Sequence, residues 1–513
     1  MTAFEPIAVD RPRASRRPAT APGPLLLAVA ITILVTAFRS AGTVDSDVAW
    51  QLWIAGRLHA GANLYTDIIE TNPPLWFWMA VPVERVAAIL HVRIEPVLVI
   101  AVGMLAALSL AATNRLIGHV APKRRALLLG YGALALTAMP WMHVGQREQL
   151  VLIGTVPYAA LIAARRKGDA VSARVAALIG VGAALGFALK HYFLIVPALL
   201  ELWLIAGQRH RWRPLRPETV SIMAVGIAYG LAIVAFERDF LTRIIPLIRL
   251  AYGVVGAMSL RDMFGPFALV GLVPLAAVVS QARKLAGGGA PFASALTIAA
   301  TGFAAIYFIQ FKGWPYHAMP LIGCSSLALA ALLAETSTPS LLRVAAPALL
   351  AIPLALSAEE QMNPALPSPD VLNAVSGLRP GDSVGFLTTE TAVPWSVTLQ
   401  GGYRYASRYN GFWMMRAIIR NELHGNPDPR LSALGRQVVS ETVDDFACMP
   451  PQRIVVTRPR PRDDTFDMLP FFLRDPRFAA LLSHYRARSR TSLETYELVS
   501  PLARPSFPCR HGV

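Results

Sequence analysis

The first loop of the chain contains Val44-Asp45-Ser46-Asp47-Val48-Ala49-Trp50 and continues to Asn72-Pro73-Pro74-Leu75-Trp76. It follows a hydrophobic segment that begins near Leu25. Two carboxylates, Asp45 and Asp47, therefore lie at the edge of a predicted membrane span, where ionisable side chains are costly and usually functional. Whether they belong to a site depends on what the other loops place near them.

The composition is that of a membrane protein. Of the 513 residues, 54% are hydrophobic and 16% are charged. Apolar stretches of about 20 residues recur, which is the length needed to cross a bilayer core. Lipid accepts only segments that satisfy their own backbone hydrogen bonds, so we predict a polytopic α-helical membrane protein. The net charge of +16 does not indicate a nucleic-acid partner, because much of it lies in short loops between apolar segments.

The basic loops determine the expected topology. Apolar segments occur at 24–42, 75–90, 96–117, 126–142, 149–164, 173–189, 191–207, 218–236, 265–281, 291–310, 315–334 and 341–357. If all of them crossed the membrane, the basic loops around Lys123 and Arg165 would lie outside, against the positive-inside rule. Residues 75–90 contain Pro82, Glu84 and Arg85 and fit an interfacial helix better. About eleven spans then follow from the rule.

The chain divides into three parts. Residues 1–23 are rich in Arg, Pro and Ala and are predicted to be a disordered basic cytoplasmic tail. Residues 24–357 form the transmembrane domain, and residues 358–513 a small extracytoplasmic α/β domain. In that last part, 382–387 and 453–457 are predicted strands, and 410–423 and 476–485 are predicted helices. Cys448 and Cys509 could pair outside the cytoplasm or stay as free thiols, whereas Cys324 lies in an apolar span.

The same topology gathers the unusual polar motifs on the outer face. These are Asp45 and Asp47, Gly145-Gln146-Arg147-Glu148, Lys190-His191-Tyr192, and Lys312-Gly313-Trp314-Pro315-Tyr316-His317. The topology was fixed by other residues, so this coincidence favours a functional site on the outer side.

The two aspartates are the candidate catalytic residues. A carboxylate near low-dielectric surroundings has a raised pKa, which suits a general base that takes a proton from a hydroxyl. The pair could also hold a divalent cation through oxygen, although no cofactor is certain from the sequence. The alternative is a solvated loop in which Asp47 caps the helix 48–60.

Cationic and aromatic residues complete the candidate site. Lys190 and Lys312 lie at the outer edge, against the topological bias, so they could bind a phosphate. Snorkelling to the interface is the alternative. The other candidate substrate-binding residues are Arg147, Glu148, His191, His317, Tyr65 and Tyr316. The two histidines lack metal-ligand spacing, the aromatic residues could equally belong to an interfacial belt, and Arg147-Glu148 could be a local ion pair.

The first loop resembles that of the GT-C fold glycosyltransferases. The likeness rests on the acidic pair, a following helix with Gly61 and Tyr65-Thr66-Asp67, and the segment Asn72-Pro73-Pro74-Leu75. It is greatest for protein O-mannosyltransferases, aminoarabinose transferases and bacterial lipopolysaccharide-core sugar transferases. Those families often carry a basic residue directly before the prolines, where this chain has Asn72.

The resemblance implies an inverting glycosyltransferase that moves a hexosyl or pentosyl group from a polyprenyl-phosphate donor to a glycan, lipid or protein acceptor. Asp47, or in second place Asp45, would be the base, with Lys190, Lys312 and Arg147 near the leaving phosphate. The expected location is the bacterial cytoplasmic membrane, with the N-terminus inside and the C-terminal domain outside.

Two other functions are compatible with an outer-face site. A polysaccharide polymerase or ligase would also use lipid-linked glycans. A lipid or sugar transporter is less favoured, because transporters place ionisable residues near mid-span and repeat broken helices in two halves.

Overall fold

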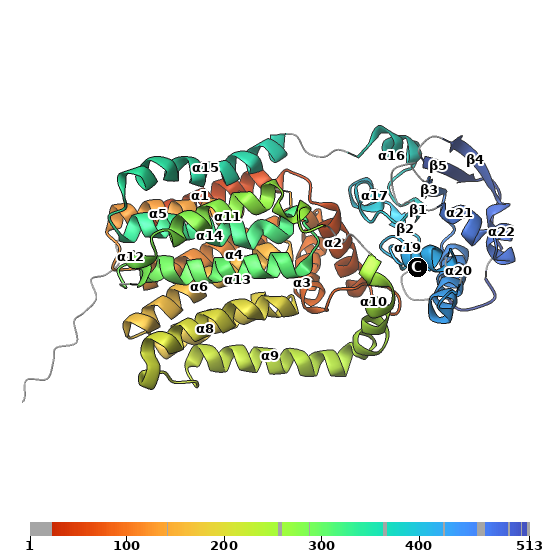
Figure 1. The fold of residues 1–513 in the computed structure, drawn as a ribbon. Helices are drawn as coiled ribbons and strands as arrows, with labels where there is room; N and C mark the ends of the chain where they lie inside the picture. The colour runs from red at the N-terminus through yellow and green to blue at the C-terminus, as the bar shows by residue number, and fades with distance from the viewer. Residues whose placement is uncertain are drawn as a thin grey trace, which may run out of the picture.

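A computed structural model of the protein describes residues 23–140, 142–254, 259–286, 288–362, 367–423, 426–458, 467–490, 493–503 and 505–509. A bundle of long helices is followed by a smaller domain with a five-stranded sheet (Figure 1). At this level the predicted fold class, a helical membrane protein with a small C-terminal α/β region, is confirmed. Residues 1–22 of the predicted disordered tail lie outside the described residues.

The predicted apolar segments correspond closely to the observed helices. The long helices are α1 (Gly23–Ser40), α4 (Ile94–Leu116), α5 (Pro122–Thr137), α6 (Arg147–Lys167), α7 (Ala173–Ala188), α8 (Ile195–Gln208), α9 (Pro217–Phe236), α11 (Pro266–Val279), α13 (Pro291–Gln310), α14 (Pro315–Glu335) and α15 (Ser340–Met362). Shorter elements join them: α2 (Ser46–His59), α3 (Leu75–Leu90), η1 (His191–Leu194), η2 (Arg209–Arg211), η3 (Phe240–Ile244), α10 (Ile245–Ala251), η4 (Tyr252–Val254), η5 (Asp262–Phe264) and α12 (Ala282–Ala286).

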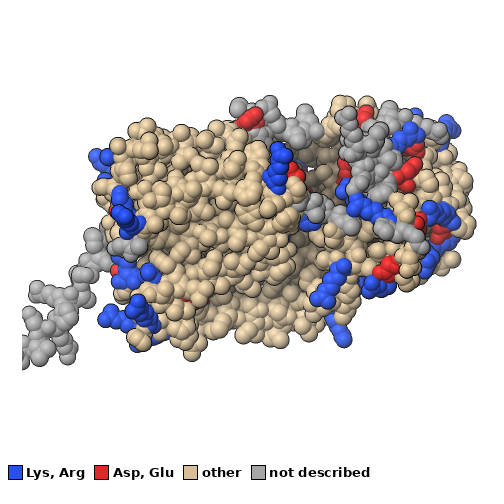
Figure 2. All heavy atoms as spheres, viewed as in Figure 1, with Lys and Arg blue, Asp and Glu red and all other residues tan. Residues whose placement is uncertain are grey.

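The bundle has the surface of a multi-pass membrane protein. Seven helices in the described residues are at least 18 residues long and apolar enough to span a bilayer, and α7 and α11 are shorter apolar helices. None of the apolar window in α9 is buried against protein, so this helix needs lipid around it. On the face drawn in Figure 2, Lys and Arg gather toward the two ends with an uncharged band between them. The number of eleven spans stays a prediction.

The central helices are α6 and α14, which are buried along most of their length. They pack against each other and against α13. Helices α2 and α3 lie at one end of the bundle, next to the smaller domain (Figure 1). Helix α3 has 16 residues and is not among the candidate spans, so its interfacial position also stays a prediction.

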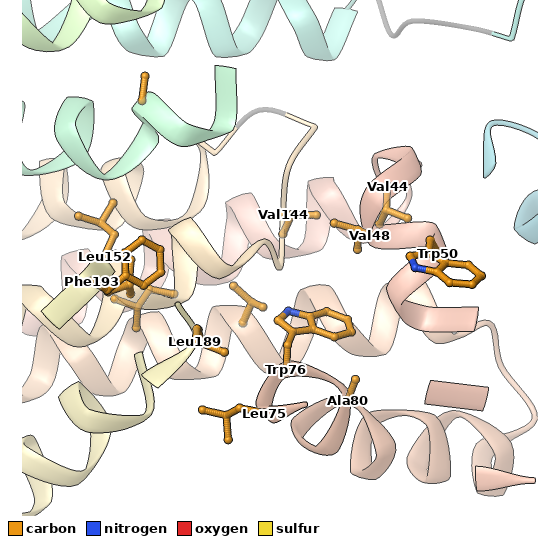
Figure 3. Packing of buried hydrophobic residues seen from close by; sticks show 14 of the residues in the cluster. Val44, Val48, Trp50, Leu75, Trp76, Ala80, Val144, Leu152, Leu189 and Phe193 are labelled. Carbon is orange, nitrogen blue, oxygen red and sulfur yellow. The ribbon is translucent and has the colours of Figure 1, made fainter. Parts of the chain in front are cut away.

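A tryptophan attaches α3 to the loop between α5 and α6. The indole Nε1 of Trp76 donates to the carbonyl of Gly145 at 2.8 Å. Figure 3 shows Trp76 beside the loop that carries Val144. Gly145 has a φ of 85°, and a Cβ there would come within 2.7 Å of Leu98 Cδ2, so only glycine fits this turn.

The C-terminal domain, which we call the outer domain because it lies outside the helical bundle (Figure 1), contains a mixed sheet in the order β2-β1-β3-β5-β4. Its strands are β1 (Ser383–Leu387), β2 (Arg404–Tyr405), β3 (Arg453–Thr457), β4 (Tyr485–Arg490) and β5 (Leu493–Leu498). Strand β1 is parallel to β2 and β3, whereas β5 is antiparallel to β3 and β4. The helices are α16 (Pro369–Ala374), α17 (Ala392–Trp395), α18 (Thr398–Gly401), α19 (Met415–Glu422), α20 (Pro429–Cys448), α21 (Met468–Phe472) and α22 (Pro476–Leu482).

The predicted elements of the outer domain are found, with shorter helices. The predicted helix 410–423 is reduced to α19, and the predicted helix 476–485 ends at Leu482, before Tyr485 begins β4. The two cysteines left open by the sequence are paired, because Cys448 and Cys509 form a disulfide. Cys324 is a buried free thiol.

The disulfide should stabilise the outer domain. It closes a loop of 61 residues, for which chain entropy predicts a stabilisation of about 4 kcal/mol. Exchanging both Cys448 and Cys509 for serine should therefore make the most protected amides of α20 exchange about a thousandfold faster. Hydrogen exchange measured by mass spectrometry checks this, and wild-type protein treated with a reducing agent should behave like the double variant. Unchanged protection of α20 would contradict the prediction.

Candidate functional site

The candidate residues come together where helices begin at one end of the bundle. Asp47 lies in the first turn of α2, Arg147 and Glu148 in the first turn of α6, and His317 in the first turn of α14. Lys190 immediately precedes η1. Helix N-termini carry partial positive charge and unpaired N–H groups, so this end of the bundle favours an anionic ligand.

Asp45 is a paired carboxylate. Its Oδ2 lies 3.1 Å from His143 Nδ1 and 3.4 Å from Gln146 Nε2, and Ser46 donates to its Oδ1 at 3.2 Å. Burial opposes the charge on Asp45, but His143 and the weaker donors outweigh it and hold its pKa below the usual value. The backbone N–H of Asp45 also donates to the carbonyl of Met142 at 3.2 Å, which fixes the first loop against the loop between α5 and α6.

Asp47 is the unpaired carboxylate of the two. Helix α2 begins at Ser46 with Asp45 at its N-cap position, so Asp47 does not cap the helix. No hydrogen bond or ion pair joins the Asp47 carboxylate to any other described residue, and the side chain is partly buried. Burial, followed by the negative charge of Asp45, raises the pKa of Asp47 to about 6, against the opposing charge of Arg147. Such a carboxylate is suited to accept a proton near neutral pH.

Arg147 is a buried cation with spare hydrogen-bond donors. Its side chain is 4% exposed, and its Nε and Nη1 have no hydrogen-bond partner among the described residues. Buried guanidinium nitrogens are almost always paired in proteins, and leaving them unpaired costs free energy. The spare donors of Arg147 therefore indicate a ligand with acceptor oxygens, and a phosphate matches the forked geometry of a guanidinium.

Lys190, Glu148 and His317 form a buried polar cluster beside Arg147. Lys190 Nζ donates to Glu148 Oε1 at 2.6 Å and lies 3.5 Å from His317 Nε2. Burial lowers the pKa of Lys190, and the charge of Glu148 partly restores it. Glu148 Oε2 and His317 Nδ1 have no hydrogen-bond partner in the described part of the chain. Lys190 thus already has a carboxylate partner, which makes Arg147 the stronger candidate for phosphate binding.

The remaining predicted residues surround this cluster at different distances. Tyr316 is buried, with its ring 5.3 Å from that of His143 and 5.7 Å from Lys190 Nζ. Lys312 is partly buried, and its ammonium lies 4.7 Å from the ring centre of Tyr252. His191 is exposed and contacts the ring of Tyr192, and no contact in the described part of the chain places it with the carboxylates.

Tyr65 supports the first loop rather than facing the cations. Its hydroxyl donates to the carbonyl of Asn72 at 2.7 Å, and its ring lies 5.2 Å from that of Phe240. Asn72 in turn donates through its backbone and side-chain nitrogens to Glu70 Oε1 at 2.8 and 2.7 Å. The turn before Pro73 is therefore held by partly buried hydrogen bonds.

Sequence reasoning missed three residues of the site. His143 was not among the candidate residues, but its Nδ1 lies 3.1 Å from Asp45 Oδ2. Glu70, which is 4% exposed, was not singled out, although a carboxylate after the apolar pair Ile68-Ile69 was a usable signal. Tyr252 lies in a segment for which no element was predicted, and its ring stands under Lys312.

The aspartates do not by themselves complete a metal site. No group of three or more His, Cys, Asp or Glu side chains in the described residues could hold a metal ion. Asp45 is already engaged by His143, so a divalent cation at Asp45 and Asp47 would need further ligands from a substrate.

A cavity of about 340 Å³ lies elsewhere on α2. It is lined by residues of α2, α3, the α3–α4 loop and α18, among them Trp53, Arg57 and Glu84. With about 100° between successive residues, the lining residues Leu52, Trp53 and Gly56 lie on the side of α2 away from Asp47. This cavity is therefore separate from the cluster of Asp47 and Arg147.

Comparison with known proteins identifies the fold. No family model matches the sequence, and no curated protein matches it either. The structure is similar to the crystal structure of ArnT from Cupriavidus metallidurans bound to undecaprenyl phosphate, with a TM-score of 0.53 and 14% sequence identity over 95% of this chain and 100% of that one. For ArnT in the apo state the TM-score is 0.52, at 13% identity over 93% and 98% of the two chains. The expected GT-C fold is confirmed.

Proposed function

We propose that this protein is a glycosyltransferase that moves a sugar from a polyprenyl-phosphate donor to an acceptor at the outer face of the membrane. The observation that carries the proposal is the unpaired carboxylate of Asp47, with its pKa raised to about 6, within electrostatic reach of the unpaired guanidinium nitrogens of Arg147. A base and a phosphate site beside each other are what this transfer requires. The undecaprenyl phosphate bound to ArnT, which has the same fold, supports the donor class.

The proposed reaction is a single displacement at the anomeric carbon of the donor. The acceptor hydroxyl oxygen forms a bond to that carbon while Asp47 takes the hydroxyl proton. The bond between the carbon and the phosphate oxygen breaks, and its electron pair stays on that oxygen. The negative charge of the phosphate therefore increases from one to two. Attack opposite the leaving group inverts the anomeric configuration. Asp47 then releases its proton to water.

Arg147 would stabilise the charge that develops on the leaving phosphate. Its spare N–H groups are fixed before the reaction, and preorganised donors in a buried site are worth more than in water. Lys190 neutralises the charge of Glu148, which would otherwise repel the phosphate. Asp45, held by His143, raises the pKa of its neighbour Asp47 and so makes it a stronger base.

Several features support the proposed location in a bacterial cytoplasmic membrane. Basic residues lie at the start of α5 (Lys123), in the last turn of α6 (Arg165 to Lys167) and in α12 (Arg283). Figure 1 shows α12 at the end of the bundle far from the outer domain, as expected for the cytoplasmic side. The disulfide supports an oxidising compartment for the outer domain. We therefore place the N-terminus inside, residues 24–357 in the membrane domain and residues 358–513 outside.

The test is a transfer assay with purified protein in lipid vesicles. A panel of polyprenyl-phosphate hexoses and pentoses is supplied with glycan, lipid and protein acceptors from a bacterial envelope, and the release of polyprenyl phosphate is measured. We expect release with a subset of the sugars, and an inverted anomeric centre in the product. Movement of intact lipid-linked sugar across the vesicle without release would instead identify a transporter. Transfer only of preassembled glycan chains would identify a polymerase or ligase.

A further inference from the structure

The outer domain is joined to the first loop by a backbone hydrogen bond. The N–H of Ile69 donates to the carbonyl of Arg408 at 2.7 Å, and Ile69 pairs with Tyr409 in a parallel β-bridge. Both Ile69 and Tyr409 are 3% exposed. A buried backbone bond between two parts of the chain far apart in sequence holds them in one register.

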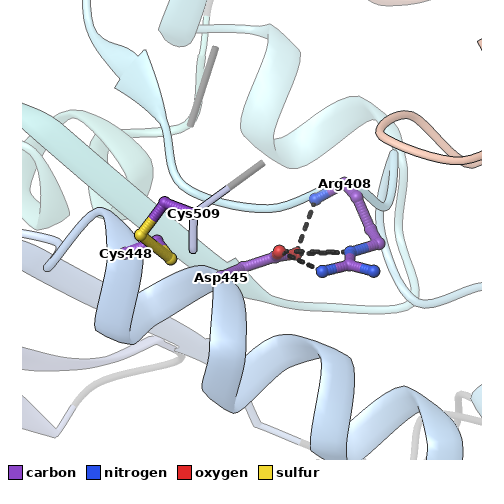
Figure 4. The surroundings of a disulfide bond; sticks show 4 residues. All are labelled: Arg408, Asp445, Cys448 and Cys509. Atoms are coloured by element: carbon purple, nitrogen blue, oxygen red, sulfur yellow. Dashed lines mark hydrogen bonds and ion pairs between the residues drawn. A yellow bond between two sulfur atoms is a disulfide. The ribbon is translucent and has the colours of Figure 1, made fainter. Parts of the chain in front are cut away.

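Arg408 is fixed in turn by α20. Its guanidinium Nε and Nη2 bind the carboxylate of Asp445, with Nη2 at 2.6 Å from Oδ1, and its backbone N–H donates to Oδ2 at 3.0 Å (Figure 4). Arg408 and Asp445 are 3% and 2% exposed. The disulfide of Cys448 lies close by at the end of α20. This bidentate pair fixes Arg408, including its backbone carbonyl, to the core of the outer domain.

Glu441 lies one turn before Asp445 on α20. It connects the contact between the outer domain and the first loop to a third segment, η3. Its Oε2 accepts from the Tyr409 hydroxyl at 2.5 Å, and its Oε1 accepts from Arg243 of η3 at 3.0 Å. Burial opposes the charge of Glu441, but a hydrogen bond from Gln437, the Tyr409 hydroxyl and the charges of Arg408 and Arg243 outweigh it and lower its pKa. The connection between α9 and α11 is thus attached to the outer domain as well.

A chain of hydrogen bonds connects the residue after Ile69 to α2, the helix that carries Asp47. Glu70, the next residue, accepts from Trp50 Nε1 at 2.5 Å and from the backbone of Asn72 at 2.8 Å. Trp50 stands one turn after Asp47 on α2. The ring of Trp50 also lies 4.9 Å from that of Trp395 in the outer domain. The beginning of α2 therefore has contacts to the outer domain through Glu70 and through Trp395.

We propose that the outer domain positions the catalytic base, with Arg408 and Glu70 as the positioning residues. Arg408 holds the backbone at Ile69, this places the Glu70 carboxylate, and Glu70 holds Trp50 and with it the first turn of α2. The inference rests on the proposed function, because it assigns the outer domain a role in that reaction rather than a second activity. Misplacement of a reacting group by about 1 Å can cost about a hundredfold in rate.

The first test compares two buried arginines of the outer domain. Arg408→Gln breaks the contact to Asp445. Arg453→Gln removes an equally buried arginine that binds the carbonyl of Ala374 at 2.8 Å and, among the described residues, has no contact with the first loop. We expect Arg408→Gln to lower kcat about tenfold to a hundredfold, with KM for the lipid donor little changed. Hydrogen exchange at the Ile69 amide should accelerate in this variant and not in Arg453→Gln. Arg408→Lys should recover part of kcat.

The second test uses the charge of Glu70. Burial and the charge of Asp45 raise the pKa of Asp47 most, and the charge of Glu70 adds to them. Glu70→Gln should therefore move the acidic midpoint of the pH–rate profile below that of the wild type. The charged and titratable groups within reach of Asp47 are Asp45, Glu70, His143, Arg147, Lys190, Tyr252 and Tyr316. Only Glu70 changes in this variant.

The outcomes separate this inference from the proposed function. Equal loss of kcat in Arg408→Gln and Arg453→Gln, or unchanged exchange at Ile69, would overturn the role of Arg408. If the acidic midpoint of the pH–rate profile is the same in Glu70→Gln as in the wild type, the positioning role of Glu70 is overturned. If Asp47→Asn and Asp45→Asn both transfer sugar normally, the proposed function itself is wrong. Should Arg408→Gln fail to fold, Asp445→Asn, which keeps the carbonyl group as acceptor for the Arg408 N–H, carries the same comparison.

Discussion

Sugar transfer should be lost when Asp47 is replaced by asparagine. The amide keeps the size of the side chain but cannot accept a proton, so we expect kcat to fall about 10²- to 10⁴-fold, the usual contribution of a general base. Folding should be unaffected, because the Asp47 carboxylate has no hydrogen bond or ion pair within the described residues to lose. The measurement is the release of polyprenyl phosphate, together with size-exclusion profiles that compare the variant with the wild type.

The pH dependence of the wild type follows from the same carboxylate. Only the deprotonated form of Asp47 can accept a proton, and its pKa is raised to about 6. Transfer should therefore increase as the pH rises through about 6 and level off above it, with no acidic limb near the ordinary aspartate pKa. A rate independent of pH between 5 and 7 would contradict Asp47 as the base.

Asp45→Asn is the matched control, because it makes the same chemical change two residues away. Asp45 is bound to His143 and its negative charge raises the pKa of Asp47. Asp45→Asn should therefore retain transfer and shift the acidic midpoint to lower pH. If Asp45→Asn abolishes transfer while Asp47→Asn retains it, the two roles are reversed.

The membrane helices could be predicted closely from the sequence. The predicted segments 75–90 and 291–310 coincide with α3 and α13, because long apolar runs between polar loops leave little freedom for the ends of a helix. The basic loops also predicted which polar motifs would share an end of the bundle. The structure places Asp47, Arg147 and Lys190 together at that end.

The pairing within the site could not be predicted, because it depends on contacts between distant segments. Asp45 and Asp47 are alike in the sequence, but His143, 98 residues away, pairs with Asp45 alone. Lys190 was expected to face a phosphate as a free cation, but Glu148 approaches it from another helix. Hydropathy describes the environment of a segment, but it contains no information about which charged residues form pairs.

The outer domain was predicted least completely. Helix α20 and strands β4 and β5 had not been predicted. Strand β4 contains Arg486, Arg488 and Arg490 and lies at the edge of the sheet, so it lacks the apolar pattern of a central strand. The pairing of Cys448 with Cys509 depends on the fold that brings α20 beside the end of the chain.

Replacing Arg147 should have the second largest effect on transfer. Arg147→Gln removes the donors proposed to stabilise the leaving phosphate, and loss of one such group costs about 10²- to 10³-fold in kcat. Arg147→Lys should recover only part of this, because an ammonium keeps the charge but lacks the fork that matches two phosphate oxygens. The rate at which polyprenyl phosphate is released in the transfer assay should fall. The affinity of the protein for polyprenyl phosphate as product should also decrease. Arg93→Gln is the control, since the Arg93 side chain is 61% exposed and pairs with Glu95.

Stability distinguishes a ligand-binding role of Arg147 from a structural one. A structural arginine has partners, and its removal leaves them unpaired and destabilises the fold. Nε and Nη1 of Arg147 are buried without partners, so Arg147→Gln should leave the thermal stability of the ligand-free protein unchanged or raise it. Added polyprenyl phosphate should stabilise the wild type and not the variant, because a ligand stabilises only the state that binds it. A variant that melts earlier without ligand, and is still stabilised by polyprenyl phosphate, would show that the phosphate binds elsewhere.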